Sequence, residues 1–267
     1  MGLIGITRKP VLLHAEDEEC LIQNKSQEQV LSDHLHSRPS GCEEISIKDV
    51  LEASKGISSK IHICHLSSCE GMELLKNRSR NISCGVTPHH SLLSVERDLV
   101  TQAFYKVNPP IRSSFDKEIL FNALKNGMVD VLESDHAPHT RDEKNVDFDK
   151  APSGVPGVET MYPLFLHLVK KDALPFQRLV SLMCTHPADL MEIPKGRIEV
   201  GRDADFIIVD LKNDSRIESD KLHSKCGWTP FEDWSAIFPE SVFIRGERVI
   251  DNQEIQVSKG FGRFVGA

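Results

Sequence analysis

Short apolar runs alternate with longer amphipathic stretches over about the first 190 positions of the chain. Four of these runs are rich in Val, Ile and Leu and stop at a polar turn, which predicts buried strands at 9–14, 60–65, 82–87 and 127–132. Apolar residues at helical spacing predict helices at 43–55, 67–77, 114–126, 157–171, 175–184 and 187–191. Strands that alternate with helices are typical of βα units and a parallel sheet.

The pattern changes after Gly196. The segments 197–210 and 241–250 contain short apolar runs broken by glycine turns, with no helical spacing between them. They predict short strands of a small β-sandwich or its edge. We therefore expect a partial barrel over 1–193 and a C-terminal β-segment, the remnant of a β-sandwich, over 194–267. The charged loop at 136–157 is long for a compact domain, and we expect it to cover the site.

Composition narrows the classes of protein that fit. The 267 residues are 39% hydrophobic and 27% charged, which is ordinary for a globular protein. A net charge of -8 and the lack of a Lys/Arg cluster argue against a nucleic-acid partner. No apolar run approaches the roughly 20 residues that span a bilayer, so we expect no membrane insertion. Seven cysteines without a Cys-x-x-Cys pair predict free thiols in a reducing, cytoplasmic location.

Three predicted strands lead into residues that bind metals. His14 and His65 end the first two, and Asp135 follows the strand at 127–132. The C-terminal ends of barrel strands face a common mouth, so these side chains can converge on one ion. Imidazole and carboxylate suit zinc, and three protein ligands with an open position are the catalytic pattern. We favour ordinary core or surface roles for His34, His36, His62, His167, His186 and His223.

Six motifs carry a family resemblance that runs along nearly the whole chain. They are Val11-Leu-Leu-His-Ala-Glu-Asp17, Ile63-Cys-His-Leu-Ser67, Val86-Thr-Pro-His-His90, Lys106-Val-Asn-Pro-Pro-Ile-Arg112, Ser134-Asp-His-Ala-Pro-His139 and Gly157-Val-Glu-Thr160. Through them the chain resembles dihydroorotases, the cyclic amidohydrolases of the amidohydrolase superfamily. The Gly-Arg-Asp-Ala-Asp-Phe segment from Gly201 is similar to the superfamily's C-terminal β-segment.

The resemblance implies an α/β fold, a partial (β/α)8 TIM-type barrel of the metal-dependent hydrolase kind with a small C-terminal β-sandwich segment. It implies reversible conversion of N-carbamoyl-L-aspartate to (S)-dihydroorotate in de novo pyrimidine biosynthesis, with zinc as cofactor, usually two ions per site. His14 and His65 would bind one metal, while Asp135 would bind the other and move the proton. The residues implied to contact the small-molecule substrate are Asn108, His139, Ser153 and Gly154.

The front of the chain departs from the family's pattern. The family's first strand carries His-x-His, but here His34-Leu-His36 follows the His14 strand and so stands in the wrong order. A complete barrel takes about 250 residues, so we expect the N-terminal third of the usual protein to be absent, one zinc or none to bind, and weak or no activity alone. An open barrel exposes strand edges, which predicts a homo-oligomer or a partner chain that covers it.

Two alternatives stay open. Allantoinase and dihydropyrimidinase-like hydrolases share the metal site, but their equivalents of Asn108 and His139 usually differ, which favours dihydroorotase. The second alternative is a non-catalytic partner subunit derived from a dihydroorotase. Retention of His14, His65, Asp135 and His139 speaks against a long-relaxed site.

Overall fold

The computed structural model describes residues 9–97 and 101–265. The chain divides into two compact units, one formed by residues 1–159 with 219–230 and the other by residues 160–218 with 231–267. These units do not divide the chain at 193/194. Compact units and family domains are defined differently, so the domain boundary expected there stays a prediction.

The first unit contains a parallel sheet of four strands in the order β1-β2-β3-β4. The strands are shorter than the apolar runs that predicted them: β1 (Val11–Leu13), β2 (Ile61–Ile63), β3 (Ile82–Val86) and β4 (Val131–Leu132). Every residue of β2 and β4 is buried. Because the four strands run in one direction, their C-terminal ends share one edge of the sheet.

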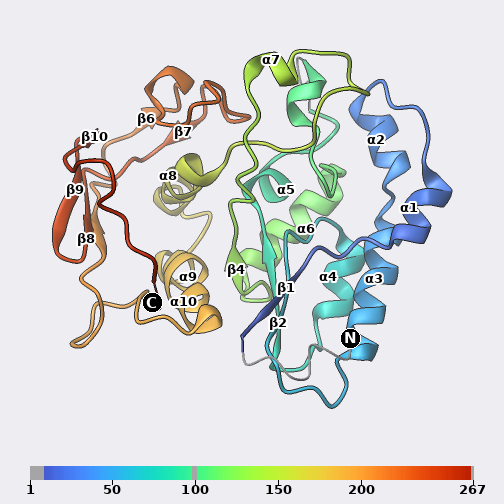
Figure 1. Ribbon diagram of the computed structural model, residues 1–267, viewed down its shortest axis with the longest axis horizontal. Coiled ribbons are helices and arrows are strands. Elements are labelled where there is room, and N and C mark those ends of the chain that lie inside the picture. Colours follow the sequence, from blue (N-terminus) through green and yellow to red (C-terminus); the bar gives the residue numbers. More distant parts are fainter. Residues whose placement is uncertain (1–8, 98–100, 266–267) are drawn as a thin grey trace. The chain divides into compact units, whose positions relative to one another are not determined.

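Helices connect these strands, as parallel pairing requires. They are α1 (Glu18–Asn24), α2 (Leu31–Ser37), α3 (Ser40–Ala53), α4 (Cys69–Leu75), α5 (Pro88–Leu92), α6 (Ser114–Lys125) and α7 (Arg141–Lys144), with a 3-10 turn, η2 (Gln102–Tyr105). Helix α4 packs against both α3 and α6 alongside the strands (Figure 1). Helix α6 begins at a capping box, in which Ser113 and Asp116 bind each other's backbone N–H groups.

A buried carboxylate joins α3 to the turn after β2. Glu43 is 2% exposed, and its two oxygens accept hydrogen bonds from the N–H and hydroxyl groups of Ser67 and Ser68, both N–H bonds at 2.9 Å. These four donors satisfy the charge away from water. The bonds therefore fix the turn that carries His65 relative to α3.

We expect Glu43→Ala to lower the free energy of unfolding by about 3 kcal/mol, because it leaves buried donors without an acceptor. Urea unfolding measures this loss. Glu44→Ala is the matched control, since Glu44 lies beside Glu43 on α3 and forms only a partly exposed pair with Lys48; its expected cost is under about 1 kcal/mol. Equal losses in the two variants would contradict the role given to Glu43.

The prediction of free thiols throughout the chain was wrong for one pair. Cys20 of α1 and Cys42 of α3 form a disulfide, whereas Cys64, Cys69, Cys84, Cys184 and Cys226 are free. The two bonded cysteines are 22 residues apart in the sequence, and they meet only because α1 packs against α3. Sequence spacing therefore carried no signal for the bond.

The second unit contains the helical and antiparallel parts predicted for the C-terminal half. Its helices are α8 (Val158–Lys170), which begins two residues before the unit, α9 (Phe176–Val180) and α10 (His186–Met191), with a π-turn, η3 (Ser181–Thr185), between the last two. A sheet with the order β10-β9-β8-β5 is formed by β5 (Phe206–Ile208), β8 (Ser241–Ile244), β9 (Glu247–Asp251) and β10 (Glu254–Ile255). A separate pair is formed by β6 (Ser215–Arg216) and β7 (Ser235–Ala236). The 3-10 turn η4 (Ser219–Lys221) belongs to the first unit.

Helix length bears on the expectation that the chain does not insert into a membrane. Helix α3, the longest of those described, has 14 residues. Among the residues that the structure describes, no helix combines the length and the apolar character that crossing a membrane requires.

Candidate active site

The two strand-end histidines lie side by side. His14 follows β1 and His65 follows β2, and His14 Nδ1 is 3.2 Å from His65 Nε2. Two nitrogens bound to one tetrahedral zinc at about 2.1 Å would be roughly 3.4 Å apart. Pairing of β1 with β2 therefore brings these two side chains to the spacing that a single ion needs.

Glu16 sets the orientation of the His14 ring. His14 Nε2 lies 2.9 Å from Glu16 Oε2, and Arg38 Nε donates to Glu16 Oε1 at 3.2 Å. Burial raises the pKa of Glu16, but the hydrogen bonds from His14 and Arg38 outweigh it and hold the pKa below its ordinary value. A carboxylate at Glu16 accepts from Nε2–H, so Nδ1 of His14 is left to face His65 and a metal.

Asp135 lies near enough to both histidines for them to affect its pKa, but the groups of described residues whose ligand atoms lie within 4.8 Å of one another do not include His14, His65 and Asp135. Burial raises the pKa of Asp135, its interactions with His65 and His14 lower it, and the Glu133 carboxylate raises it, with a net rise above the ordinary value. Asp135 and His65 both have left-handed backbone, with φ of 43° and 40°. Such conformations in non-glycine residues are concentrated at functional sites, where the fold holds a side chain in a required position.

His89 is a functional candidate that the sequence did not single out. The residue is 1% exposed, and its Nε2 atom, like Nδ1 of His65, is buried without a hydrogen-bond partner among the described residues. Burial, and then the charge of His65, lowers the pKa of His89 to about 3, which keeps the imidazole neutral. A neutral ring nitrogen without a hydrogen-bond partner can bind a cation. The only sequence signal for His89 was the pair of adjacent histidines in Val86-Thr-Pro-His-His90.

Three of the four residues expected to contact substrate form one hydrogen-bonded group, and the fourth, Gly154, follows Ser153 in the chain. Ser153 Oγ donates to Asn108 Oδ1 at 3.3 Å, and His139 Nε2–H donates to the Ser153 carbonyl at 3.2 Å. Gly154 N–H donates to the carbonyl of Lys106 at 2.9 Å. The φ of Gly154 is 137°, and a side chain there would collide with Ala137, so the position requires glycine. The loop at 136–157 is thus attached to the segment that carries Asn108.

Lys144 anchors the same loop from inside. The side chain is completely buried, and its Nζ donates to the carbonyls of Pro152 and Lys106 at 2.8 and 3.2 Å. Burial, and then the charge of Lys106, lowers the pKa of Lys144 from 10.5 to about 8. The fold therefore disfavours the charged form of this lysine relative to the unfolded chain.

This pKa shift predicts a pH dependence of stability. Between about pH 8 and 10.5 the unfolded chain binds a proton at Lys144 that the folded chain lacks, so stability rises with pH in this window. We expect the unfolding free energy of the parent to rise by about 2 kcal/mol relative to Lys144→Met between about pH 7.5 and 10. Urea unfolding at both pH values measures it. Lys150→Met is the control: because Lys150 is exposed, the difference in unfolding free energy between this variant and the parent should not change with pH. If the difference for Lys144→Met does not change with pH either, the lowered pKa of Lys144 is refuted.

Comparison with known proteins identifies the family. The model of the amidohydrolase family matches residues 7–249. The dihydroorotase of Methanosarcina acetivorans is 40% identical over 95% of this chain and 57% of its own length. The dihydroorotase of Thermoplasma volcanium is 44% identical over 96% of this chain and 58% of its own. The resemblance expected from the motifs is confirmed, and the chain spans less than three fifths of the length of these relatives.

A solved structure agrees on the fold. The L-hydantoinase (dihydropyrimidinase) from Arthrobacter aurescens superposes with a TM-score of 0.89 at 30% identity, covering 96% of this chain and 60% of the hydantoinase. Together with the parallel sheet and the separate antiparallel sheet, this confirms the predicted partial TIM-type barrel with a C-terminal β-segment. The chain belongs to the amidohydrolase family.

Proposed function

We propose that this chain carries a dihydroorotase-type site, which converts N-carbamoyl-L-aspartate to (S)-dihydroorotate and back. The observation that carries the proposal is the hydrogen-bonded group of Asn108, Ser153 and His139, attached to the segment that also bears Asp135. Asparagine and histidine side chains can hydrogen-bond an imide ring and a carboxylate, both of which dihydroorotate presents. The similarity to dihydroorotases at 40% and 44% identity supports the same substrate.

In this proposal His14, His65 and Asp135 hold zinc. The metal would polarise the amide carbonyl and lower the pKa of the attacking water. Asp135 carries a proton to the leaving ring nitrogen during ring opening and takes it back during closure. Glu16 keeps His14 in the ligating orientation, and the loop at 136–157, held by Lys144, positions His139 and Ser153 on the substrate.

Substrate competition tests the proposal. Zinc-loaded chain is incubated with dihydroorotate, hydantoin, dihydrouracil or allantoin, and loss of each cyclic amide is followed by absorbance or chromatography. We expect zinc-dependent hydrolysis of dihydroorotate above the other three, at a low rate. Faster hydrolysis of hydantoin or dihydrouracil would favour the dihydropyrimidinase alternative, which the fold similarity to hydantoinases also fits.

A second candidate function is a non-catalytic subunit derived from a dihydroorotase. It is favoured by Leu12, which is 51% exposed on β1, the edge strand of the sheet among the described residues. A second copy or a partner chain that adds a strand beside β1 would cover this edge. Zinc binding without turnover of any of the four amides would support this candidate, and a cytoplasmic location is part of both proposals.

A further inference from the structure

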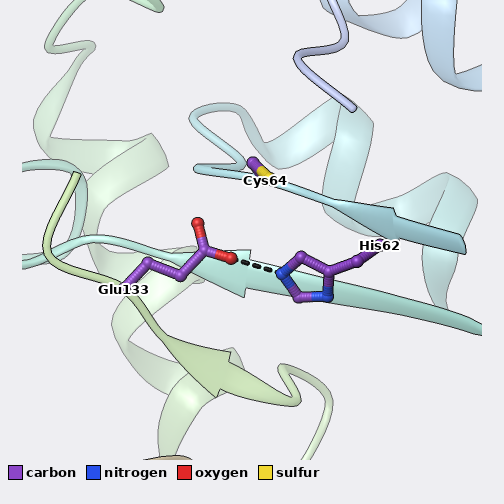
Figure 2. A group of neighbouring side chains, drawn as sticks. All are labelled: His62, Cys64 and Glu133. Atoms are coloured by element: carbon purple, nitrogen blue, oxygen red, sulfur yellow. Dashed lines mark hydrogen bonds and ion pairs between the residues drawn. The ribbon is translucent and has the colours of Figure 1, made fainter. Parts of the chain in front are cut away.

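A second group of metal-binding side chains lies beside the first. Ligand atoms of His62, Cys64 and Glu133 all lie within 4.8 Å of one another. Figure 2 shows the His62 ring and the Glu133 carboxylate facing each other, with Cys64 at the end of β2. His62 is 1% exposed, so its interaction with Glu133 is formed almost entirely away from water.

The two ring nitrogens of His62 face different partners, Nδ1 toward Ser83 and Nε2 toward Glu133. Ser83 Oγ donates to the Ile61 carbonyl at 3.4 Å and lies 2.7 Å from His62 Nδ1. When the hydroxyl donates to Ile61 it accepts from Nδ1–H and the Nε2 lone pair faces Glu133; when it donates to Nδ1, Nε2–H donates to Glu133. The first arrangement is the one that a metal ion bound to Nε2 and the Glu133 carboxylate would select.

A glycine on the neighbouring strand makes room for Glu133. A side chain at Gly85 of β3 would overlap the Glu133 carboxylate. The second carboxylate oxygen accepts from the N–H of His65 at 2.9 Å, so the carboxylate is held from two sides. The position of the oxygen that faces His62 is therefore fixed before any ion arrives.

We propose that His62, Cys64 and Glu133 form a binding site for a divalent cation of the zinc class, separate from the ion held by His14 and His65. Imidazole, thiolate and carboxylate are all zinc ligands, and the hydrogen bond from Nδ1 to Ser83 is the kind of support that zinc-bound histidines have. Binding releases the thiol proton and any proton shared between His62 and Glu133. The proposal does not rest on hydrolysis of any amide.

Cobalt(II) chloride is the probe, because cobalt(II) bound to a thiolate gives a near-ultraviolet charge-transfer band. Titration of the metal-free chain is expected to produce this band. Cys64→Ser is expected to abolish it and lower the bound cobalt by one ion per chain. Cys69→Ser is the matched control, because Cys69 lies near Glu70 and Asp116 in another possible donor group, and this variant is expected to keep the band. His14→Gln is expected to keep it too.

Glu133→Gln separates ligation from hydrogen bonding. Glutamine still accepts from His65 N–H but has lost the charge, so we expect at least a 10-fold weaker affinity of the band-forming site for cobalt. Circular dichroism of each variant without metal checks that it is folded. The proposal is overturned if the folded parent gives no band, or if Cys64→Ser gives an undiminished band. His62 and Glu133 would then be joined by a hydrogen bond alone.

Discussion

Asparagine in place of Asp135 is expected to lower zinc-dependent hydrolysis of dihydroorotate by a factor of about 10³, within the range typical of lost acid–base catalysis. The substitution keeps the size of the side chain but removes the group that can take and return a proton. The burial that raises the pKa of this carboxyl also makes it better suited to proton transfer than an exposed aspartate. The assay follows ring absorbance at high protein concentration, because we expect slow turnover by the parent.

The control for Asp135→Asn is Asp149→Asn, an exposed aspartate in the same loop, which should leave the rate unchanged within a factor of about 2. Zinc content is measured on the same samples, so that loss of the metal is distinguished from loss of the proton carrier. Hydrolysis by Asp135→Asn within a few-fold of the parent would remove Asp135 from the catalytic role.

Much of the framework could be predicted from periodicity. The helices over 114–126 and 157–171 were predicted within one residue of α6 and α8, because their apolar faces repeat at helical spacing. The residues at the strand ends could also be predicted to lie together, because the C-terminal ends of parallel strands lie at one edge of the sheet. His14 and His65 are side by side there. Strand length was overestimated: of the run 127–132, only Val131–Leu132 forms the ladder.

Other features depended on contacts between distant segments, which no local pattern encodes. Helices α1 and α2 fall in a polar stretch with little apolar periodicity, and packing of α1 on α3 creates the disulfide. His62 was assigned an ordinary core role, and its neighbour Glu133 is 71 residues away in the sequence. The need for glycine at position 85 likewise comes from a side chain on the adjacent strand.

Asparagine in place of His65 is expected to weaken zinc binding at the His14 site on the order of 10³-fold. Structural zinc sites yield about 10–16 kcal/mol, so each of four ligands contributes roughly 2.5–4 kcal/mol, and the upper end of that range is about 10³-fold in affinity. Asparagine is chosen because it tolerates the left-handed backbone of this position, where φ is 40°, so strain should not add to the effect. Competition with a chromogenic chelator measures the affinity.

The matched control is His36→Asn, which changes an exposed histidine on α2 and should leave zinc affinity unaltered. The two variants together also separate the His14 site from the one proposed at His62, because His65→Asn keeps Cys64 and Glu133 and therefore the cobalt–thiolate band. If His65→Asn binds zinc as tightly and in the same ratio as the parent, the 3.2 Å approach of His14 and His65 is a hydrogen bond between two imidazoles. In that case Nε2 of His65 serves the packing of the strand ends, and the metal ligands of this family member must be sought elsewhere, with the unpartnered Nε2 of His89 as the first position to change.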